Sequence, residues 1–140
     1  MIERKIVIGL ITSSEFLQMT RRTLDPRLLE APMAQRLAEW CVEYYDRYSK
    51  APGRDIEGIF YQKIKAPNFP PELAEEIEQE ILPELSEEAM EAPVNLNYLL
   101  DLTRPYLKER QLRTFCDESL GALDVGEITE AENRAAEFSP

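Results

Sequence analysis

Apolar residues recur along most of this chain at steps of three and four, the spacing that places side chains on one face of an α-helix. The clearest such segment in the first half of the chain begins at Pro32 and is ended by Ser49–Gly53. Its apolar and aromatic positions are Met33, Leu37, Trp40, Cys41, Tyr44 and Tyr48. The pattern predicts an amphipathic helix whose apolar face packs on a core, with an aromatic rim.

The first apolar segment, Ile6–Ile11, is rich in β-branched residues and resembles a buried strand by propensity alone. No other segment offers a convincing partner strand, and an unpaired strand leaves its backbone groups unsatisfied. We therefore predict a buried central helix. Ser13 or Ser14 then caps a short second helix, and Asp25-Pro26 begins a short helical turn.

An acidic helix is predicted over residues 70–92. Its apolar positions are Leu73, Ile77, Ile81 and Leu85, and Pro83 is expected to kink or interrupt it. Another helix, capped by Asp55, is predicted before the acidic helix.

Asn95 is predicted to cap a long helix that Pro105 interrupts and bends early, and a last helix is predicted over residues 127–138. The two form a C-terminal hairpin. The long helix carries an apolar stripe that is our candidate interface, with the alternative that it is internal core. Its members are Leu99, Leu102, Tyr106, Leu112, Phe115, Leu120 and Leu123.

Together these elements predict an all-α, compact multi-helix bundle of one domain. Residues 1–95 form the bundle and residues 96–140 form the C-terminal helical hairpin of the same domain. No apolar run reaches the roughly 18 residues that span a membrane, so we expect a cytoplasmic protein without membrane contact. In a reducing compartment Cys41 and Cys116, both within apolar helical patterns, are expected to be buried free thiols.

Charge is unevenly distributed along the chain. Residues 1–70 hold eleven basic and nine acidic residues, whereas residues 71–140 hold five basic and eighteen acidic ones. An acidic surface repels phosphate backbone, so we expect weak or no direct binding of nucleic acid. The alternative is a nucleic-acid-binding accessory domain that uses a small basic patch, Arg21, Arg22 and Arg27, with the tyrosines near Trp40 as stacking surfaces.

The sequence offers little for catalysis. It contains no histidine, and its five glycines form no phosphate-binding motif. Paired carboxylates in Glu72–Glu91, such as Glu76 with Glu80, leave a small metal-dependent enzyme as a further alternative. A solvated helix face is the simpler interpretation. We therefore expect this chain alone to have no catalytic, metal or cofactor site.

Several segments, taken in order, resemble the N-terminal domain of DnaB-like replicative DNA helicases. The first is Glu3-Arg4-Lys5-Ile6-Val7-Ile8-Gly9-Leu10-Ile11, which is similar to the opening Glu-x-x-(Ile/Val)-(Leu/Ile)-Gly-x-(Leu/Met) helix of that family. Asp25–Leu29, Ala34–Tyr48 and a helix from Asp55 continue the resemblance. It ends at Tyr98–Leu102 and at Tyr106-Leu107-Lys108-Glu109-Arg110-Gln111-Leu112-Arg113.

The resemblance implies a domain that works through protein contacts. In that family it forms a collar of paired subunits above a RecA-like motor, buries its hairpin in a dimer contact, and offers docking surface to primase or a helicase loader. The full-length protein would then be an ATP-dependent DNA helicase. This sequence departs from the family pattern in its long acidic segment, Pro67–Pro93, and in Pro105, which favours a phage-type or divergent member.

Overall fold

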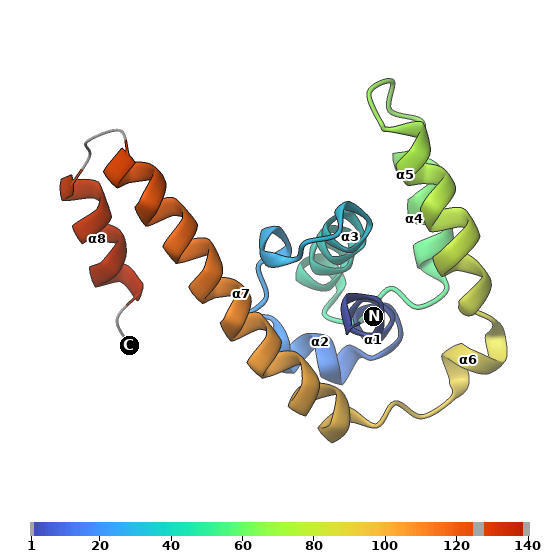
Figure 1. The fold of residues 1–140 in the computed structure, drawn as a ribbon. Coiled ribbons are helices and arrows are strands. Elements are labelled where there is room, and N and C mark those ends of the chain that lie inside the picture. The colour runs from blue at the N-terminus through green and yellow to red at the C-terminus, as the bar shows by residue number, and fades with distance from the viewer. Residues whose placement is uncertain (1, 125–127, 139–140) are drawn as a thin grey trace.

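The computed structural model describes residues 2–124 and 128–138, and among these residues the regular secondary structure is helical, without strands, which confirms the all-α prediction (Figure 1). The α-helices are α1 (Ile2–Thr12), α2 (Ser14–Thr20), α3 (Pro32–Tyr48), α4 (Asp55–Lys63), α5 (Pro71–Glu76), α6 (Glu87–Glu91), α7 (Leu96–Asp124) and α8 (Ile128–Phe138). Three shorter turns of helix are η1 (Pro26–Leu28), η2 (Ile77–Ile81) and η3 (Leu82–Glu84).

Helix α1 lies at the centre of the bundle and packs against α2, α3 and α7. Its side chains Ile6, Val7, Leu10 and Ile11 have no exposed surface. The β-branched segment is therefore a buried helix, as predicted, because burial on several sides outweighs the modest cost of β-branched residues in a helix. The Ser13 hydroxyl accepts a hydrogen bond from the Phe16 amide at 3.1 Å and caps α2.

Gly9 allows α7 to approach α1 closely. A Cβ atom built on Gly9 would lie 2.5 Å from Leu99 Cδ2 and 3.0 Å from the ring of Phe16. Only glycine fits this position without moving its neighbours. The contact fixes where the first half of α7 crosses the bundle.

Helix α3 begins at Pro32 and ends at Tyr48, and the next residue, Ser49, has a left-handed backbone with φ 60°, as the predicted end of the helix at Ser49–Gly53 requires. Trp40 is buried and its ring lies 6.4 Å from that of Phe60 and 6.1 Å from that of Phe69. Tyr48, at the end of the predicted apolar face, is exposed. The aromatic cluster is therefore core at Trp40 and surface at its C-terminal end.

The acidic segment is divided into α5, η2, η3 and α6, so Pro83 interrupts it as predicted. The π turn η2 keeps Ile77 and Ile81 both fully buried. Arg4 on α1 binds the Glu80 carbonyl at 2.8 Å and also the Glu84 carboxylate. These contacts hold the acidic segment against the bundle. Asp55 was expected to cap α4, but it is the first helical residue, and its carboxylate accepts a 2.6 Å hydrogen bond from the Tyr44 hydroxyl.

Helix α7 runs unbroken through Pro105, contrary to the predicted interruption. Pro105 is exposed, as is Asp101 one turn earlier, so the carbonyl that loses its helical partner lies on the solvent side, where water can satisfy it. The Asn95 side chain accepts a hydrogen bond from the Tyr98 amide at 3.2 Å, which confirms the predicted cap. The predicted start of the last helix at residue 127 lies outside the described residues.

The last two helices form the predicted hairpin, with α8 folded back along the second half of α7. Figure 1 shows this part of the hairpin extending away from the bundle, on the side opposite α4 and α5. The first half of α7, in contrast, packs on α1 and α2. One helix therefore serves both the core and a projecting arm.

Candidate protein-interaction surface

The apolar stripe predicted on α7 does not lie on one face of the helix. Leu99 is 8% exposed and belongs to the core, and Leu102 and Tyr106 are half-buried. Leu112, Leu120 and Leu123 are 47%, 59% and 49% exposed. The steps from Tyr106 to Leu112 and from Phe115 to Leu120 are six and five residues, so the positions after Tyr106 move to another side of a helix with 3.6 residues per turn. The first three members of the stripe therefore pack on the bundle, and Leu112, Leu120 and Leu123 lie on the surface.

We define the outer stripe as Leu112, Cys116, Leu120 and Leu123. These residues are spaced at i, i+4, i+8 and i+11, so they share one face of α7. All four are exposed. Leucines grouped in this way on a projecting arm are typical of an interaction surface rather than of scattered surface residues.

Helix α8 covers a different side of α7. Arg134 on α8 forms an ion pair with Glu118, and Ala122, one turn further along the same side of α7, is only 6% exposed. Phe115 is half-buried and lines a groove between the hairpin and Leu28. Phe115, the remaining member of the predicted stripe, therefore faces this groove and lies apart from the outer stripe.

A polar clamp joins the arm to the bundle. Glu3, 3% exposed, accepts hydrogen bonds from the Glu30 amide at 2.8 Å and the Ala31 amide at 2.9 Å. The Tyr106 hydroxyl donates to the same carboxylate. One turn along α7, Arg110 donates to the Leu28 carbonyl at 2.7 Å and pairs with Glu30 at 2.9 Å.

We define the clamp as Glu3, Glu30, Tyr106 and Arg110. Burial and the hydrogen bond to Glu3 raise the pKa of Tyr106 well above its ordinary value, so the phenol stays neutral. The sequence pattern assigns no role to the side chains of Glu3, Glu30 and Arg110, and it places Tyr106 only in the apolar stripe. A signal was nonetheless present, because Glu3, Tyr106 and Arg110 lie in the first and the last of the segments that carry the helicase resemblance.

No protein-family model matches this chain, and neither a curated protein nor a solved structure is significantly similar to it.

Two arginines of the predicted basic patch are paired within the chain. Arg21 forms a two-pronged ion pair with Asp46, with distances of 2.7 and 2.8 Å, and Arg27 pairs with Asp25 at 2.9 Å. Each arginine lowers the pKa of its partner carboxyl through these hydrogen bonds. Arg22 lies between them in sequence and is exposed. The structure thus leaves this patch with less net positive charge than its sequence suggests.

The carboxylates of Glu76 and Glu80 are exposed. Across residues 2–124 and 128–138, no three Asp, Glu, Cys or His side chains gather closely enough to hold a metal ion.

The two cysteines differ from each other. Cys41 is buried as predicted, and burial raises the pKa of its thiol well above the ordinary value. Cys116 is exposed on the outer stripe, so the prediction that it is buried is wrong.

Within the described part of the chain, none of the helices combines the length and apolar character needed to cross a membrane.

Proposed function

We propose that this chain is a protein-binding domain that self-associates through its C-terminal hairpin, as the N-terminal domain of a DnaB-like replicative helicase would. The observation that carries the proposal is the outer stripe. Leu112, Leu120 and Leu123 expose about half of their surface on an arm that projects from the bundle. Covering these side chains would contribute roughly 25 cal/mol for each Å² of apolar surface removed from water.

The placement of the clamp supports the helicase interpretation. The opening segment supplies Glu3, and the segment near the end of the resemblance supplies Tyr106 and Arg110. In the fold these segments meet, although 103 residues separate Glu3 from Tyr106 in sequence. The clamp therefore gives a structural reason why Glu3, Tyr106 and Arg110 occur in the same chain. Docking of primase or a helicase loader is part of the same proposal and rests on the resemblance.

The self-association is tested with Leu120→Asp. Leu120 is the most exposed leucine of the stripe, so the change should leave the fold intact while placing a charge in the proposed contact. We expect light scattering to show a smaller assembly for this variant, with helical circular dichroism unchanged. Met19→Asp is the matched control, because Met19 is 48% exposed on α2, away from the stripe. Equal masses for both variants and the unchanged chain would contradict the proposal.

A further inference from the structure

Three of the four positions of the outer stripe are symmetric about its cysteine, and Leu123 lies beyond this symmetric part. Leu112 and Leu120 lie four residues before and four residues after Cys116, so the sequence of side-chain sizes is the same in both directions. A twofold contact requires a surface that is complementary to itself, because each copy presents the same patch to the other. A large, small, large pattern meets this requirement when two helices run in opposite directions.

Charged residues at one edge of the stripe have the same property. Arg113 and Asp117, each one position after a member of the stripe, lie along this edge, and both are exposed. In an antiparallel pair of helices an edge meets the same edge of the partner, so Arg113 of each copy lies near Asp117 of the other. In a parallel pair the charged edge of one helix meets the opposite edge of the other, so Arg113 and Asp117 of different copies no longer lie near each other. Within one chain Arg113 contacts Glu109 at 3.1 Å, an exposed pair that contributes little to stability.

The surface is also hollowed beside one end of the stripe. Leu112 and Cys116 line this hollow together with five charged residues, which are Glu30, Glu109, Arg110, Arg113 and Asp117. A second copy packed here would bring a leucine to Leu112 and Cys116, the apolar part of the lining, and its own Asp117 to Arg113 in the charged part. The hollow thus accepts the side chain that the antiparallel arrangement supplies.

From these three features we infer that the partner of the outer stripe is a second copy of this chain, packed antiparallel with the twofold axis beside Cys116. The inference rests on the proposed self-association and specifies its geometry. Leu112 of one copy then faces Leu120 of the other, and Cys116 faces its own counterpart. The two hairpin ends point in opposite directions.

The experiment uses single cysteines and a short bismaleimide crosslinker. In a Cys116→Ser background, the variants Leu112→Cys and Leu120→Cys are purified separately, and Cys41 stays unreactive because it is buried. Antiparallel packing predicts that mixing the two gives a crosslinked dimer, whereas each variant alone gives little. The reason is that eight residues of helix separate like positions, about 12 Å at 1.5 Å per residue. The Cys116→Ser chain without a new cysteine is the control for reaction at Cys41.

Light scattering on the same samples separates the two ways of failing. If light scattering shows dimers and Leu112→Cys alone or Leu120→Cys alone crosslinks efficiently, like positions face each other. This result would overturn the antiparallel arrangement but not the self-association. Dimers that form no crosslink in any mixture would also overturn it, because the contact then lies elsewhere. Chains that stay monomeric at every concentration, before and after the substitutions, would contradict the proposed function itself.

Discussion

The Tyr106 hydroxyl donates a hydrogen bond to the buried carboxylate of Glu3, which joins the middle of α7 to the first turn of α1. The same carboxylate accepts the amides of Glu30 and Ala31, just before α3 begins. One acidic side chain therefore fixes three segments that are distant in sequence. It sets the position from which the second half of α7 leaves the bundle.

Replacing Glu3 with Gln should destabilise the domain. The amide keeps one acceptor oxygen, but its NH₂ group faces a backbone amide that is also a donor. Losing hydrogen bonds to a buried charge should lower the free energy of unfolding by about 2–3 kcal/mol. Urea denaturation followed by circular dichroism measures this change. Glu15→Gln, at an exposed position of α2, is the control, and an equal effect of the two substitutions would argue against the clamp.

Tyr106 should make the domain sensitive to alkaline pH. Its pKa is raised in the folded state, so as pH rises the unfolded chain loses this proton first. The stabilisation is complete below the unfolded pKa of about 10 and declines above it. We expect the urea midpoint to fall more between about pH 8 and about pH 11 in the unchanged chain than in Tyr106→Phe. Parallel declines would mean that Tyr106 does not contribute to this pH dependence.

Gly9 and Gly58 offer a matched pair of helical glycines. A methyl group at Gly9 would collide with Leu99 and Phe16, whereas at Gly58 it would meet nothing within 4 Å. Gly9→Ala should cost about 1–3 kcal/mol through overpacking. Gly58→Ala should instead stabilise the domain by about 0.5–1 kcal/mol through reduced backbone entropy. Thermal unfolding of both variants tests the close contact of α1 with α7, and stabilisation by both would contradict it.

Much of the helical framework could be predicted from local signals. Ser13, Pro32 and Asn95 mark helix starts through capping or a fixed backbone angle, and these effects act within one turn. The stripe on α7 was harder to interpret, because which half packs inside depends on where Gly9 lets α7 cross α1. That contact joins residues far apart in sequence.

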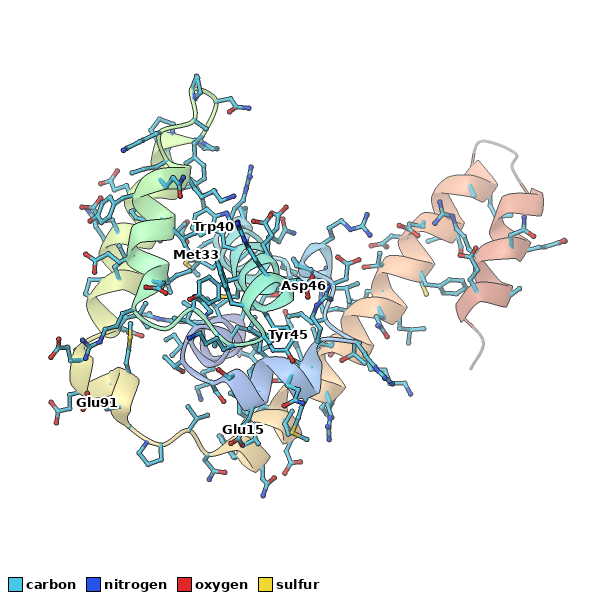
Figure 2. The ribbon with its side chains drawn as sticks, turned by 180° about the vertical axis from the view of Figure 1, so that it is seen from behind. Glu15, Met33, Trp40, Tyr45, Asp46 and Glu91 are labelled. Atoms are coloured by element: carbon cyan, nitrogen blue, oxygen red, sulfur yellow. The ribbon has the colours of Figure 1, made fainter. Side chains whose placement is uncertain are left out.

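The exposure of Cys116 and the clamp escaped prediction for a related reason. Cys116 lies in an apolar pattern, and only the path of α7 beyond the bundle places it in solvent. In the sequence, Glu3 is an ordinary acidic residue in the first turn of a helix. Its partners, Tyr106 and two backbone amides, are distant in sequence and only the fold brings them to it. Figure 2 shows the side chains of the bundle closely packed, with the hairpin extending to one side.

The central claim is that the outer stripe makes this domain self-associate. The most direct measurement is the solution mass of the unaltered chain by light scattering across a dilution series. We predict a mass at least twice that of the 16.2 kDa chain at high concentration, falling toward the single-chain value on dilution. A single-chain mass at every concentration would contradict the claim and leave Leu112, Leu120 and Leu123 as exposed residues without a partner copy.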